Sequence, residues 1–403
     1  MTAVAALGDL AEFIRGVTFK PEQVSTSDDV EAVACLRTKN VQAQLETSDL
    51  VFVPRSVVKN EAQMVRHGDI VISSANSWNL VGKSSWVGDL DFEAAIGGFI
   101  CLLRVTRDDV DARYLFRWFS SPRIQAIVRS FGQKTTNISN LNLGRARELE
   151  VPLPPLPEQR RIAAILDQVD ELRTKRRRAL TLLDELADSL FIDMFGDLVK
   201  SDHGWPTGEV RDLVAGFSSG RSLASMTEGT PESLRVLKVS AVTKGIFNPN
   251  ESKPLPLEYE PPDGHFVRKG DLLFSRANTS DLIGATAYVR DHWPNLVLSD
   301  KLWRFLWAPG AQSSALYVWS AFSRREFRRQ ISERATGSSG SMKNISQGVV
   351  LSLPLVIPPA SLREEYGEKL LKIEDARVST NSSLVKLDEL FASLQHRAFR
   401  GKL

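Results

Sequence analysis

The sequence is poor in the residues that crosslink a chain or anchor it in a membrane. Its 403 residues include two cysteines, Cys35 and Cys101, too few for a disulfide framework or a cysteine zinc site. No apolar run approaches the ~18 to 20 residues that a membrane span needs. Acidic residues also stand where a signal peptide would begin with basic ones. We therefore expect a cytoplasmic protein with no membrane partner.

Recognisable catalytic motifs are also missing. The chain has no GxxxxGK[ST] phosphate loop, no G-x-S-x-G elbow, no HExxH and no paired Cys/His spacing for a metal. Its five histidines are scattered, which favours structural roles over metal binding. The formal net charge of +2 excludes a polycation, so any nucleic-acid face must be local. The sequence thus favours a binding protein with no catalytic residues, cofactor or metal of its own.

The chain repeats itself once, which predicts two copies of a unit of about 200 residues. The segments VRHGDIVISSANSWNLVG and VRKGDLLFSRANTSDLIG begin at Val65 and Val267, an offset of 202. Three further blocks recur: LDELADSL with LDELFASL and Pro154-Pro155 with Pro358-Pro359, both at an offset of 204, and Asn137-Ile138-Ser139 with Asn344-Ile345-Ser346 at 207. We attribute the change of offset to small insertions between the blocks.

Each copy combines two kinds of pattern, and the mixture predicts an α+β fold. Residues 1–153 contain short apolar runs separated by turn residues, typical of strands, with a helical passage at 113–131 broken by Pro122. A proline strap follows, and from Glu158 to Phe195 apolar residues recur at helical spacing. The predicted domains are 1–153 and 199–357, and the predicted strap-and-helix spacers are 154–198 and 358–403.

The two long helices are predicted to pair, because two apolar stripes in one chain can bury each other as a coiled coil. The alternative is that each helix packs on its own globular part. The predicted coil core consists of Val169, Leu172, Leu183, Leu186, Leu190, Ile373, Leu384, Leu387 and Leu394.

Basic residues gather in matched stretches of the two copies. Between Arg113 and Arg147 no Asp or Glu interrupts them, and the corresponding stretch of the second copy is basic apart from Glu326 and Glu333. A basic face beside Gly-, Ser-, Thr- and Asn-rich loops suits phosphate binding, although a solvated helix face would look the same. We assign phosphate contacts to Arg113, Arg117, Arg129, Lys134, Arg324, Arg328 and Lys343.

Polar loops beside these stretches differ between the copies inside a shared frame, as expected of two modules that read different sequences. The loops are QKTTNISNLN from Gln133 and GSSGSMKNIS from Gly337, together with SSANSWN and SRANTSD. The Ser-x-Ala-Asn elements are equally well explained as turns, because Asn hydrogen-bonds its own backbone. The base-reading candidates are Asn76, Thr135, Asn137, Arg276, Asn278 and Asn344.

At the junction of the first domain and its helix the chain resembles a known family. The residues PLPPLPEQRRIAAILDQVDELRTKRR from Pro152 and LLDELADSLFIDMFGD from Leu182 are similar to the central region of type I restriction-modification specificity (S) subunits. The VR-x-GD segments and the Asn-Ile-Ser element resemble their target recognition domains. The second copy departs from the pattern, with IPPASLREEYGEK at its junction.

The resemblance implies a fold and a role. It implies two α/β target recognition domains joined by two long helices that pair as an antiparallel coiled coil with pseudo-two-fold symmetry. It implies a subunit without catalysis that binds double-stranded DNA, each domain reading half of an interrupted site. The implied partners are two methyltransferase subunits, which carry S-adenosylmethionine, and, for cleavage, restriction subunits, which use ATP and Mg²⁺.

The main alternative is a two-lobed coiled-coil scaffold whose basic faces hold acidic proteins. An enzyme with unrecognised motifs is a third. Salt-dependent binding of duplex DNA separates the scaffold from the DNA-binding subunit.

Overall fold

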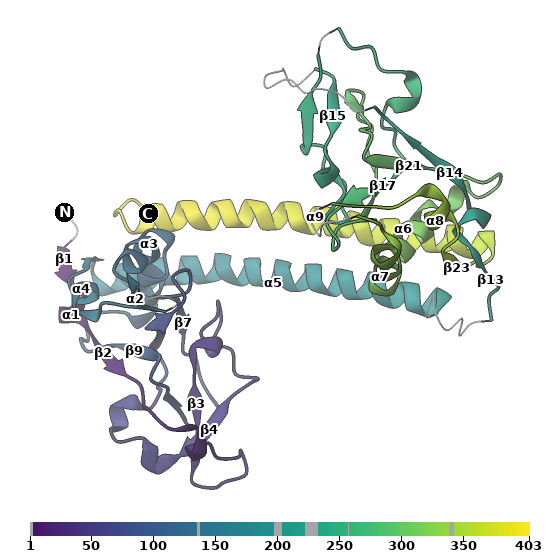
Figure 1. Cartoon of the computed structure of the whole chain (residues 1–403). Helices are drawn as coiled ribbons and strands as arrows, with labels where there is room; N and C mark the ends of the chain where they lie inside the picture. The colour runs from purple at the N-terminus through teal and green to yellow at the C-terminus, as the bar shows by residue number, and fades with distance from the viewer. Residues whose placement is uncertain (1–2, 135–137, 197–203, 222–232, 257, 338–341) are drawn as a thin grey trace. The chain divides into compact units, whose positions relative to one another are not determined.

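A computed structural model describes residues 3–134, 138–196, 204–221, 233–256, 258–337 and 342–403. The chain forms two compact units, unit 1 of Met1–Arg177 with Ser382–Leu403, and unit 2 of Arg178–Asn381 (Figure 1). Each unit contains one of the predicted recognition domains together with part of each long helix. The segments predicted as separate spacers are thus shared between the units.

Unit 1 is an α+β domain. Its strands and helices are β1 (Ala3–Ala6), α1 (Leu7–Leu10), β2 (Ala11–Arg15), β3 (Ala32–Leu36), β4 (Val51–Pro54), β5 (Ile70–Ser73), β6 (Ala75–Asn76), β7 (Ser84–Trp86), β8 (Ala94–Ile96), β9 (Ile100–Val105), α2 (Ala112–Phe119), α3 (Pro122–Ser130), β10 (Gln133–Lys134), β11 (Ser139–Asn140), α4 (Leu143–Arg147) and β12 (Glu150–Leu153). One sheet has the order β2-β9-β5-β7 and another β4-β3-β8, while β1 pairs with β12. Proline at the start of α3 marks the helix boundary that the sequence predicted.

Unit 2 repeats this topology. Its elements are β13 (Thr207–Glu209), β14 (Val214–Ser219), β15 (Arg235–Leu237), β16 (Ser252–Pro254), β17 (Leu272–Ser275), β18 (Ala277–Asn278), β19 (Thr286–Tyr288), β20 (Leu296–Val297), β21 (Leu302–Trp307), α6 (Ala315–Ser323), α7 (Arg325–Arg334), β22 (Lys343–Asn344), α8 (Gln347–Leu351) and β23 (Pro354–Val356). The sheets have the orders β14-β21-β17-β19, β16-β15-β20 and β13-β23, element for element those of unit 1. The predicted duplication and the predicted α+β class are therefore confirmed.

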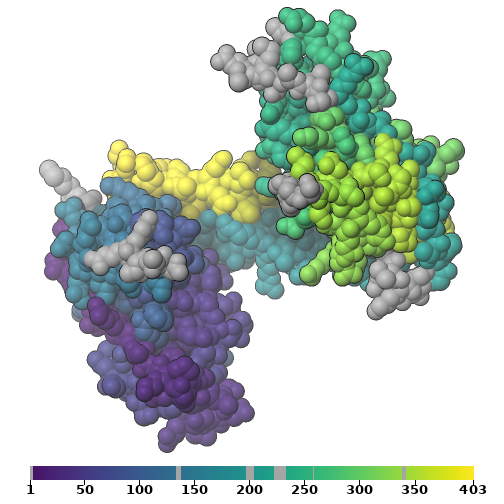
Figure 2. Space-filling view, viewed as in Figure 1, coloured from purple at the N-terminus to yellow at the C-terminus, as the bar shows by residue number. Residues whose placement is uncertain are grey.

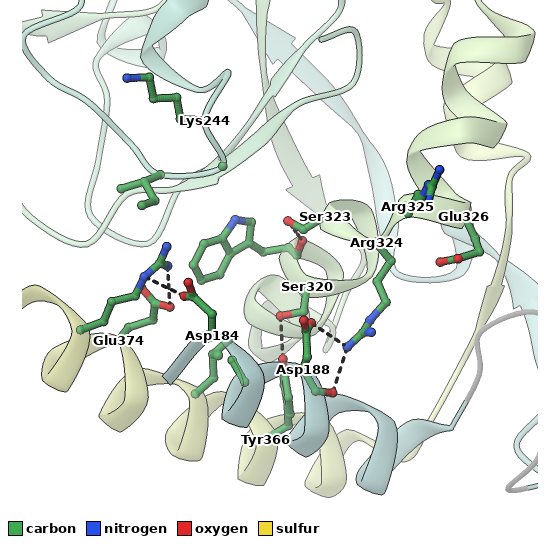
Figure 3. Close-up of a pocket in the computed structure, with 16 residues that line it drawn as sticks. Asp184, Asp188, Lys244, Ser320, Ser323, Arg324, Arg325, Glu326, Tyr366 and Glu374 are labelled. Atoms are coloured by element: carbon green, nitrogen blue, oxygen red, sulfur yellow. Dashed lines mark hydrogen bonds and ion pairs between the residues drawn. The ribbon is translucent and has the colours of Figure 1, made fainter. Parts of the chain in front are cut away.

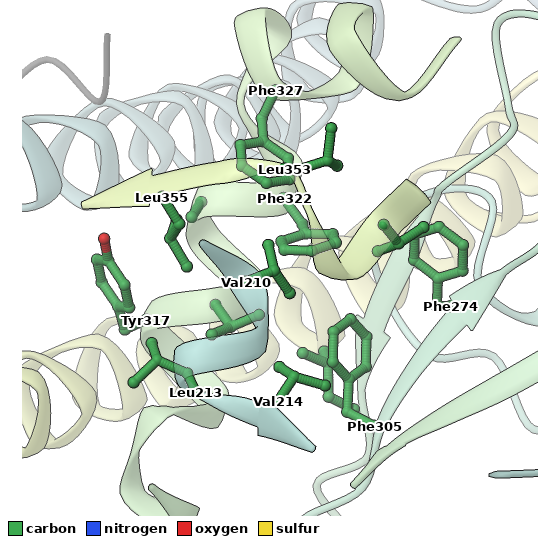
Figure 4. Packing of buried hydrophobic residues seen from close by; sticks show 14 of the residues in the cluster. Val210, Leu213, Val214, Phe274, Phe305, Tyr317, Phe322, Phe327, Leu353 and Leu355 are labelled. Atoms are coloured by element: carbon green, nitrogen blue, oxygen red, sulfur yellow. The ribbon is translucent and has the colours of Figure 1, made fainter. Parts of the chain in front are cut away.

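The main core of unit 2 is aromatic. Phe274, Phe305 and Phe322 pack together under the four-stranded sheet, with ring centroids of Phe305 and Phe322 5.4 Å apart (Figure 4). Each such ring buries enough apolar surface to contribute about 1.5–3 kcal/mol. Tyr317 of α6 lies at the edge of this core and donates a hydrogen bond of 2.6 Å to the carbonyl of Val356.

The same tyrosine contact occurs in unit 1. Tyr114 of α2 donates a hydrogen bond of 2.7 Å to the carbonyl of Pro152, which corresponds to Val356. Each tyrosine therefore fixes the helix that carries it, α2 or α6, to the last strand of its domain, β12 or β23. Burial raises the pKa of both phenols above the usual range, so both remain donors at neutral pH.

The repeated Gly-Asp element is a structural motif. Asp69 is almost fully buried and pairs with Arg104 at 2.7 Å, and Asp271 pairs with Arg304 at 2.8 Å. Each aspartate also accepts a hydrogen bond from the backbone N–H three residues earlier, which closes the turn. Burial raises the pKa of the Asp271 carboxyl, against the opposing effect of Arg304. The element thus fixes the start of one strand, β5 or β17, to its neighbour in the four-stranded sheet, β9 or β21.

The proline straps lead into two long helices, α5 (Leu156–Phe195) and α9 (Ala360–Ala398). Gln159 is fully buried, and its side chain bonds the backbone of Asp109, Asp111 and Pro154. Arg363 stands at the matching position of the second copy and donates to the carbonyl of Pro358. The two junctions thus share the contact with the strap carbonyl, at Pro154 and Pro358, whereas the contacts with Asp109 and Asp111 are seen for Gln159 in the first junction.

Within each unit the helix segments run antiparallel. In unit 1, Arg161 contacts the carbonyl of Leu403, whereas Arg173, further along α5, pairs with Asp388 at 2.6 Å, earlier in α9. Just after the end of α9, Phe399 packs on α2, where it meets Tyr114 at 5.7 Å between ring centroids. The space-filling view shows the C-terminal residues, in yellow, against the blue surface of the first domain (Figure 2).

Unit 2 pairs the other ends of the same two helices, and it repeats the ion pair of unit 1. Arg377 bridges to Asp184 of α5 at 3.2 Å and to Glu374 of its own helix at 3.2 Å. Arg173 makes the same two kinds of contact in unit 1, with Asp388 and Asp170. All three members are displaced by 204 positions between the copies. This pattern fixes the same helix register in both units.

The predicted coil core is partly wrong. Val169 and Ile373 are buried, and Leu183, Leu190, Leu384, Leu387 and Leu394 are half-buried. Leu172 and Leu186, however, are 46% and 52% exposed and face away from the partner helix. Residues one position later, Arg173 and Ala187, face it instead. Hydrophobic spacing alone could not identify the contacting face of α5, because an ion-paired arginine and a small alanine lie on it.

Candidate nucleic-acid interface

A small β-ribbon brings together two loops that the sequence singled out in unit 1. β11 pairs antiparallel with β6, so that Ser139 lies opposite Asn76 and Asn140 opposite Ala75. β11 also pairs with β10, which closes a hairpin. Thr135 and Asn137, two base-reading candidates, lie outside the described residues. The backbone of Lys134 is in β10, but its side chain is not described.

Unit 2 builds the same ribbon in the same register. β22 pairs with β18, so that Lys343 lies opposite Asn278 and Asn344 opposite Ala277. Thr336 exchanges backbone hydrogen bonds of 2.8 and 2.7 Å with Asn344 and takes the place of β10. The hairpin and the Ser-x-Ala-Asn strand are therefore neighbours in both domains; the sequence named both as candidate reading loops but did not predict that they pair.

The register corrects one sequence alignment. Asn344 corresponds to Asn140, not to Asn137, because each lies opposite the alanine of the Ser-x-Ala-Asn strand. The next residues, Leu141 and Ile345, donate matching backbone hydrogen bonds of 2.8 and 3.1 Å to that strand. The offset is thus 204 here as well. The repeated letters Asn-Ile-Ser produced the offset of 207 by coincidence.

Asn76 and Asn278 serve their own turns. The Asn76 carboxamide donates to the hydroxyl of Ser73 at 3.0 Å and accepts from the N–H of Ser77 at 2.8 Å. Asn278 donates to Ser275 at 3.3 Å and accepts from Thr279 at 2.9 Å. Both elements are therefore turns, as the alternative explanation held. Because each carboxamide is used within its own turn, we do not expect either one to contact a base.

A glycine presses the turn after each ribbon strand against a helix. Gly82 and Gly284 have φ of +81° and +74°, a region that side chains disfavour. A Cβ at Gly82 would lie 2.4 Å from Cγ1 of Val128 in α3, and one at Gly284 would lie 2.6 Å from Cγ2 of Ile331 in α7. The basic helices α3 and α7 therefore hold the ribbons at matched positions.

The ribbon surroundings differ between the units. Arg276 is half-buried and bonds the carbonyl of Asp300 at 2.6 Å, with the carboxylate of the same residue at 3.8 Å. Ser74 occupies the matching place in unit 1. The backbone N–H of Ser74 bonds the carbonyl of Phe99, and that of Arg276 bonds the carbonyl of Lys301. Phe99 is 64% exposed and Lys301 is exposed, so one ribbon borders an aromatic side chain and the other a cation.

Arg113 and Arg117 contact the long helix α5, whereas the sequence predicted that they would contact phosphates. Arg117 is 6% exposed and pairs with Asp167 at 2.6 Å and Asp170 at 2.9 Å, both in α5. Arg113 pairs with Asp167 at 2.9 Å and lies over the ring of Trp86. These arginines fasten the domain to the long helix, so we revise the prediction of phosphate contacts for both. Their partners are about 50 positions away in sequence, which composition could not reveal.

The remaining predicted phosphate ligands fall into two groups. Arg324 lies 4.3 Å from the ring centroid of Phe191 and pairs with Asp188 at 3.4 Å, so it too faces α5. Arg129 in α3, Arg328 in α7 and Lys343 in β22 lie closer to the ribbons and are partly exposed. Arg328 donates to the carbonyl of Asp281 at 3.1 Å, in the turn after the ribbon strand, and Lys343 donates to that of Ser332 at 3.3 Å.

Burial lowers the pKa of Arg328 to about 10, which leaves the guanidinium charged at neutral pH. Its Nη1 is buried and, among the described residues, has no hydrogen-bond partner. A cation held in this way, beside the ribbon turn and without a carboxylate partner in the described part of the chain, is suited to an anionic ligand.

Unit 2 also contains a cleft of about 510 Å³ between α6 and the long helices (Figure 3). Two ion pairs lie along it, between Arg324 and Asp188 and between Arg377 and Asp184. Tyr366 donates to the hydroxyl of Ser320 at 2.7 Å. These contacts join the domain to the long helices beside the cleft, which Lys244, Arg325 and Glu326 also line.

Among the described residues, no group of three His, Cys, Asp or Glu side chains is placed to hold a metal ion. No helix there has a stretch long and apolar enough to cross a lipid bilayer.

Sequence and structure comparisons agree with this architecture. A model of the family described as "Type I restriction modification DNA specificity domain" matches residues 2–182. The type I restriction enzyme EcoKI specificity subunit of Escherichia coli K12 is 28% identical over 420 residues, covering 99% of this chain and 89% of the relative. The StySPI specificity subunit of Salmonella potsdam is 26% identical, covering 100% and 89%.

A solved structure shares the fold over the full length. The S subunit of a type I restriction-modification system from M. genitalium superposes with a TM-score of 0.64 at 13% identity, covering 99% of this chain and 96% of that one. In sequence the chain is thus similar to type I restriction-modification specificity subunits over nearly its whole length, and it shares the fold of one solved S subunit.

Proposed function

We propose that this chain is the DNA-recognition subunit of a type I restriction-modification complex and that each unit recognises one half of an interrupted duplex site. The observation that supports the proposal most strongly is the ribbon that occurs twice in one register, with different side chains around it. Two copies of one frame with different contact residues are suited to two half-sites of different sequence.

The ribbons are the base-reading elements in this proposal. A two-stranded β-ribbon fits the major groove, where each base pair presents a distinct pattern of donors and acceptors. Accessible positions beside the ribbons that differ between the copies are Ser74 and Arg276, and Phe99 and Lys301. These differences let the two domains prefer different bases from the same docking geometry.

Basic side chains near the ribbons position each domain on the phosphate backbone. Arg129, Arg328 and Lys343 remain our candidates, since each lies on the ribbon or on the helix that its turn contacts. Lys134 stays a prediction from sequence. Such contacts supply affinity without choosing sequence.

The long helices set the number of unread base pairs between the half-sites. Each contributes residues to both units, and the 40 residues of α5 correspond to a helix of about 60 Å. One turn of B-DNA takes ~34 to 36 Å, so helices of this length suit half-sites more than one turn apart.

Catalysis belongs to the partners in this proposal. Two methyltransferase subunits bring S-adenosylmethionine, restriction subunits bring ATP and Mg²⁺ for cleavage, and the complex acts in the cytoplasm. The chain itself supplies no catalytic residue and binds no cofactor.

The proposal is tested by selection from a random duplex pool with the chain in complex with its methyltransferase. We expect enrichment of two short blocks at a fixed gap and no enrichment by the methyltransferase alone. Binding of acidic proteins, with no salt-dependent binding of duplex DNA, would instead support the two-lobed scaffold.

A further inference from the structure

The two ribbons share one exposed polar side chain at the same position. Asn140 in β11 and Asn344 in β22 stand opposite Ala75 and Ala277. The geometry points to these asparagines as specificity-determining residues, each taking the major-groove edge of an adenine common to both half-sites. This inference rests on the proposed DNA recognition and deepens it by naming the residues and the base.

Strand alternation directs both side chains outward. Ser139 and Leu141, on either side of Asn140, are 2% and 7% exposed, whereas Asn140 is exposed. In unit 2, Lys343 is half-buried and Ile345 is 4% exposed, whereas Asn344 is exposed. Because successive side chains of a strand point to opposite faces, each asparagine lies on the outer face of its ribbon.

Both carboxamides are available to a ligand. Within the described ranges neither Asn140 nor Asn344 has a side-chain hydrogen bond, in contrast to Asn76 and Asn278, which close their own turns. The residue across the ribbon is alanine in both units, and its methyl group leaves the neighbouring carboxamide unobstructed.

The backbone holds both asparagines firmly in place. Each is followed by a residue whose N–H bonds the adjacent strand, at 2.8 Å from Leu141 and 3.1 Å from Ile345. A helix begins two residues later, capped by the side chains of Asn142 and Ser346. A polar group fixed between a strand pair and a capped helix loses little freedom on binding, which favours a specific contact.

The chemistry of the carboxamide selects the base. Asn has one acceptor oxygen and a donor NH₂, which match the N6 donor and N7 acceptor of adenine as a bidentate pair. Accessible positions beside the ribbons differ between the units, with Ser74 in one and Arg276 in the other. The half-sites are therefore expected to differ around a shared adenine.

The test uses the full chain in complex with its methyltransferase and duplex pools randomised at each half-site. Asn140→Ala should reduce discrimination for adenine at one position of one half-site by about 5- to 150-fold, and leave the other half-site unchanged. Asn344→Ala should do the same at the matching position of the other half-site. Asn140→Asp should move the preference toward cytosine, whose N4 amino group donates to a carboxylate.

Asn381→Ala is the matched control, because Asn381 is exposed on α9 and outside both ribbons. Thermal unfolding of each variant establishes that the fold is retained. A uniform loss of affinity would show a phosphate contact, and an unchanged preference would show no contact; either result overturns the inference. A parent complex that selects no bipartite site would instead overturn the proposed function itself.

Discussion

Replacing Arg117 with methionine tests whether this arginine fastens the first domain to α5. Arg117→Met keeps most of the apolar side chain but removes the guanidinium, which pairs with the carboxylates of Asp167 at 2.6 Å and Asp170 at 2.9 Å. We expect unit 1 to lose stability while the salt dependence of DNA binding stays the same. The result separates a structural arginine from the phosphate ligand that the sequence suggested.

The size of the loss follows from the environment of the two carboxylates. Removing one partner of a buried ion pair costs about 3–5 kcal/mol. Asp167 and Asp170 are 34% and 32% exposed, and they keep Arg113 at 2.9 Å and Arg173 at 2.8 Å. Solvent and the second partners reduce the penalty, so we expect about 2–3 kcal/mol.

The two cysteines provide an assay that reports on unit 1 alone. Cys35 and Cys101 are fully buried in unit 1, and burial raises their pKa values to about 11 and about 12. Neither thiol should react at pH 8 until unit 1 unfolds, because the thiolate is the reactive form. Pulsed thiol labelling across a urea series should show the midpoint of Arg117→Met lowered by about 1–2 M.

Ser320→Ala is the matched control, since Ser320 occupies the position of Arg117 in α6 and lies in unit 2. It should leave the labelling midpoint unchanged. If Arg117→Met keeps the midpoint and instead lowers the salt slope of DNA binding by about 1, the structural assignment is refuted and the arginine is a phosphate ligand.

Three further predictions concern the helices and the ribbons. Leu387→Asp should lower the free energy of unfolding by about 2–4 kcal/mol, because Leu387 packs on the buried cluster of unit 1. Leu186→Asp should lower it by under about 1 kcal/mol, because Leu186 is 52% exposed. Equal losses of stability in urea unfolding would contradict this helix register. Arg328→Ala should weaken binding to all duplexes alike and lower the salt slope by about 1, measured by fluorescence anisotropy, and a sequence-selective loss would show a base contact instead. Gly284→Ala should destabilise unit 2 by more than about 1 kcal/mol, because the new Cβ meets Ile331 at a positive φ; an unchanged thermal midpoint would show that the turn adapts freely.

Features encoded by local patterns were predictable from the sequence. The duplication, the helix break at Pro122 and the two long helices follow from spacing, proline chemistry and apolar periodicity, and the structure has all three. The hairpin loops and the Ser-x-Ala-Asn segments could also be named as candidate reading loops, since each recurs in the two copies, although their pairing could not be foreseen.

Features that depend on distant partners were not predictable. Arg117 could not be distinguished from a phosphate ligand, because its partners Asp167 and Asp170 become neighbours only when α2 packs on α5. Asn140 was missed because the repeated triplet Asn-Ile-Ser drew the alignment to Asn137. A constant offset of 204 through Gly144 and Gly348 would have identified it from sequence.

The central claim is tested most directly by mapping methylated adenines in cells that carry the partner methyltransferase, with and without this chain. The account predicts methylation that requires the chain and falls on two short blocks separated by a fixed gap, one block for each unit. Methylation that is the same without the chain, or that falls on a single uninterrupted block, would contradict recognition of a split site by two matched domains.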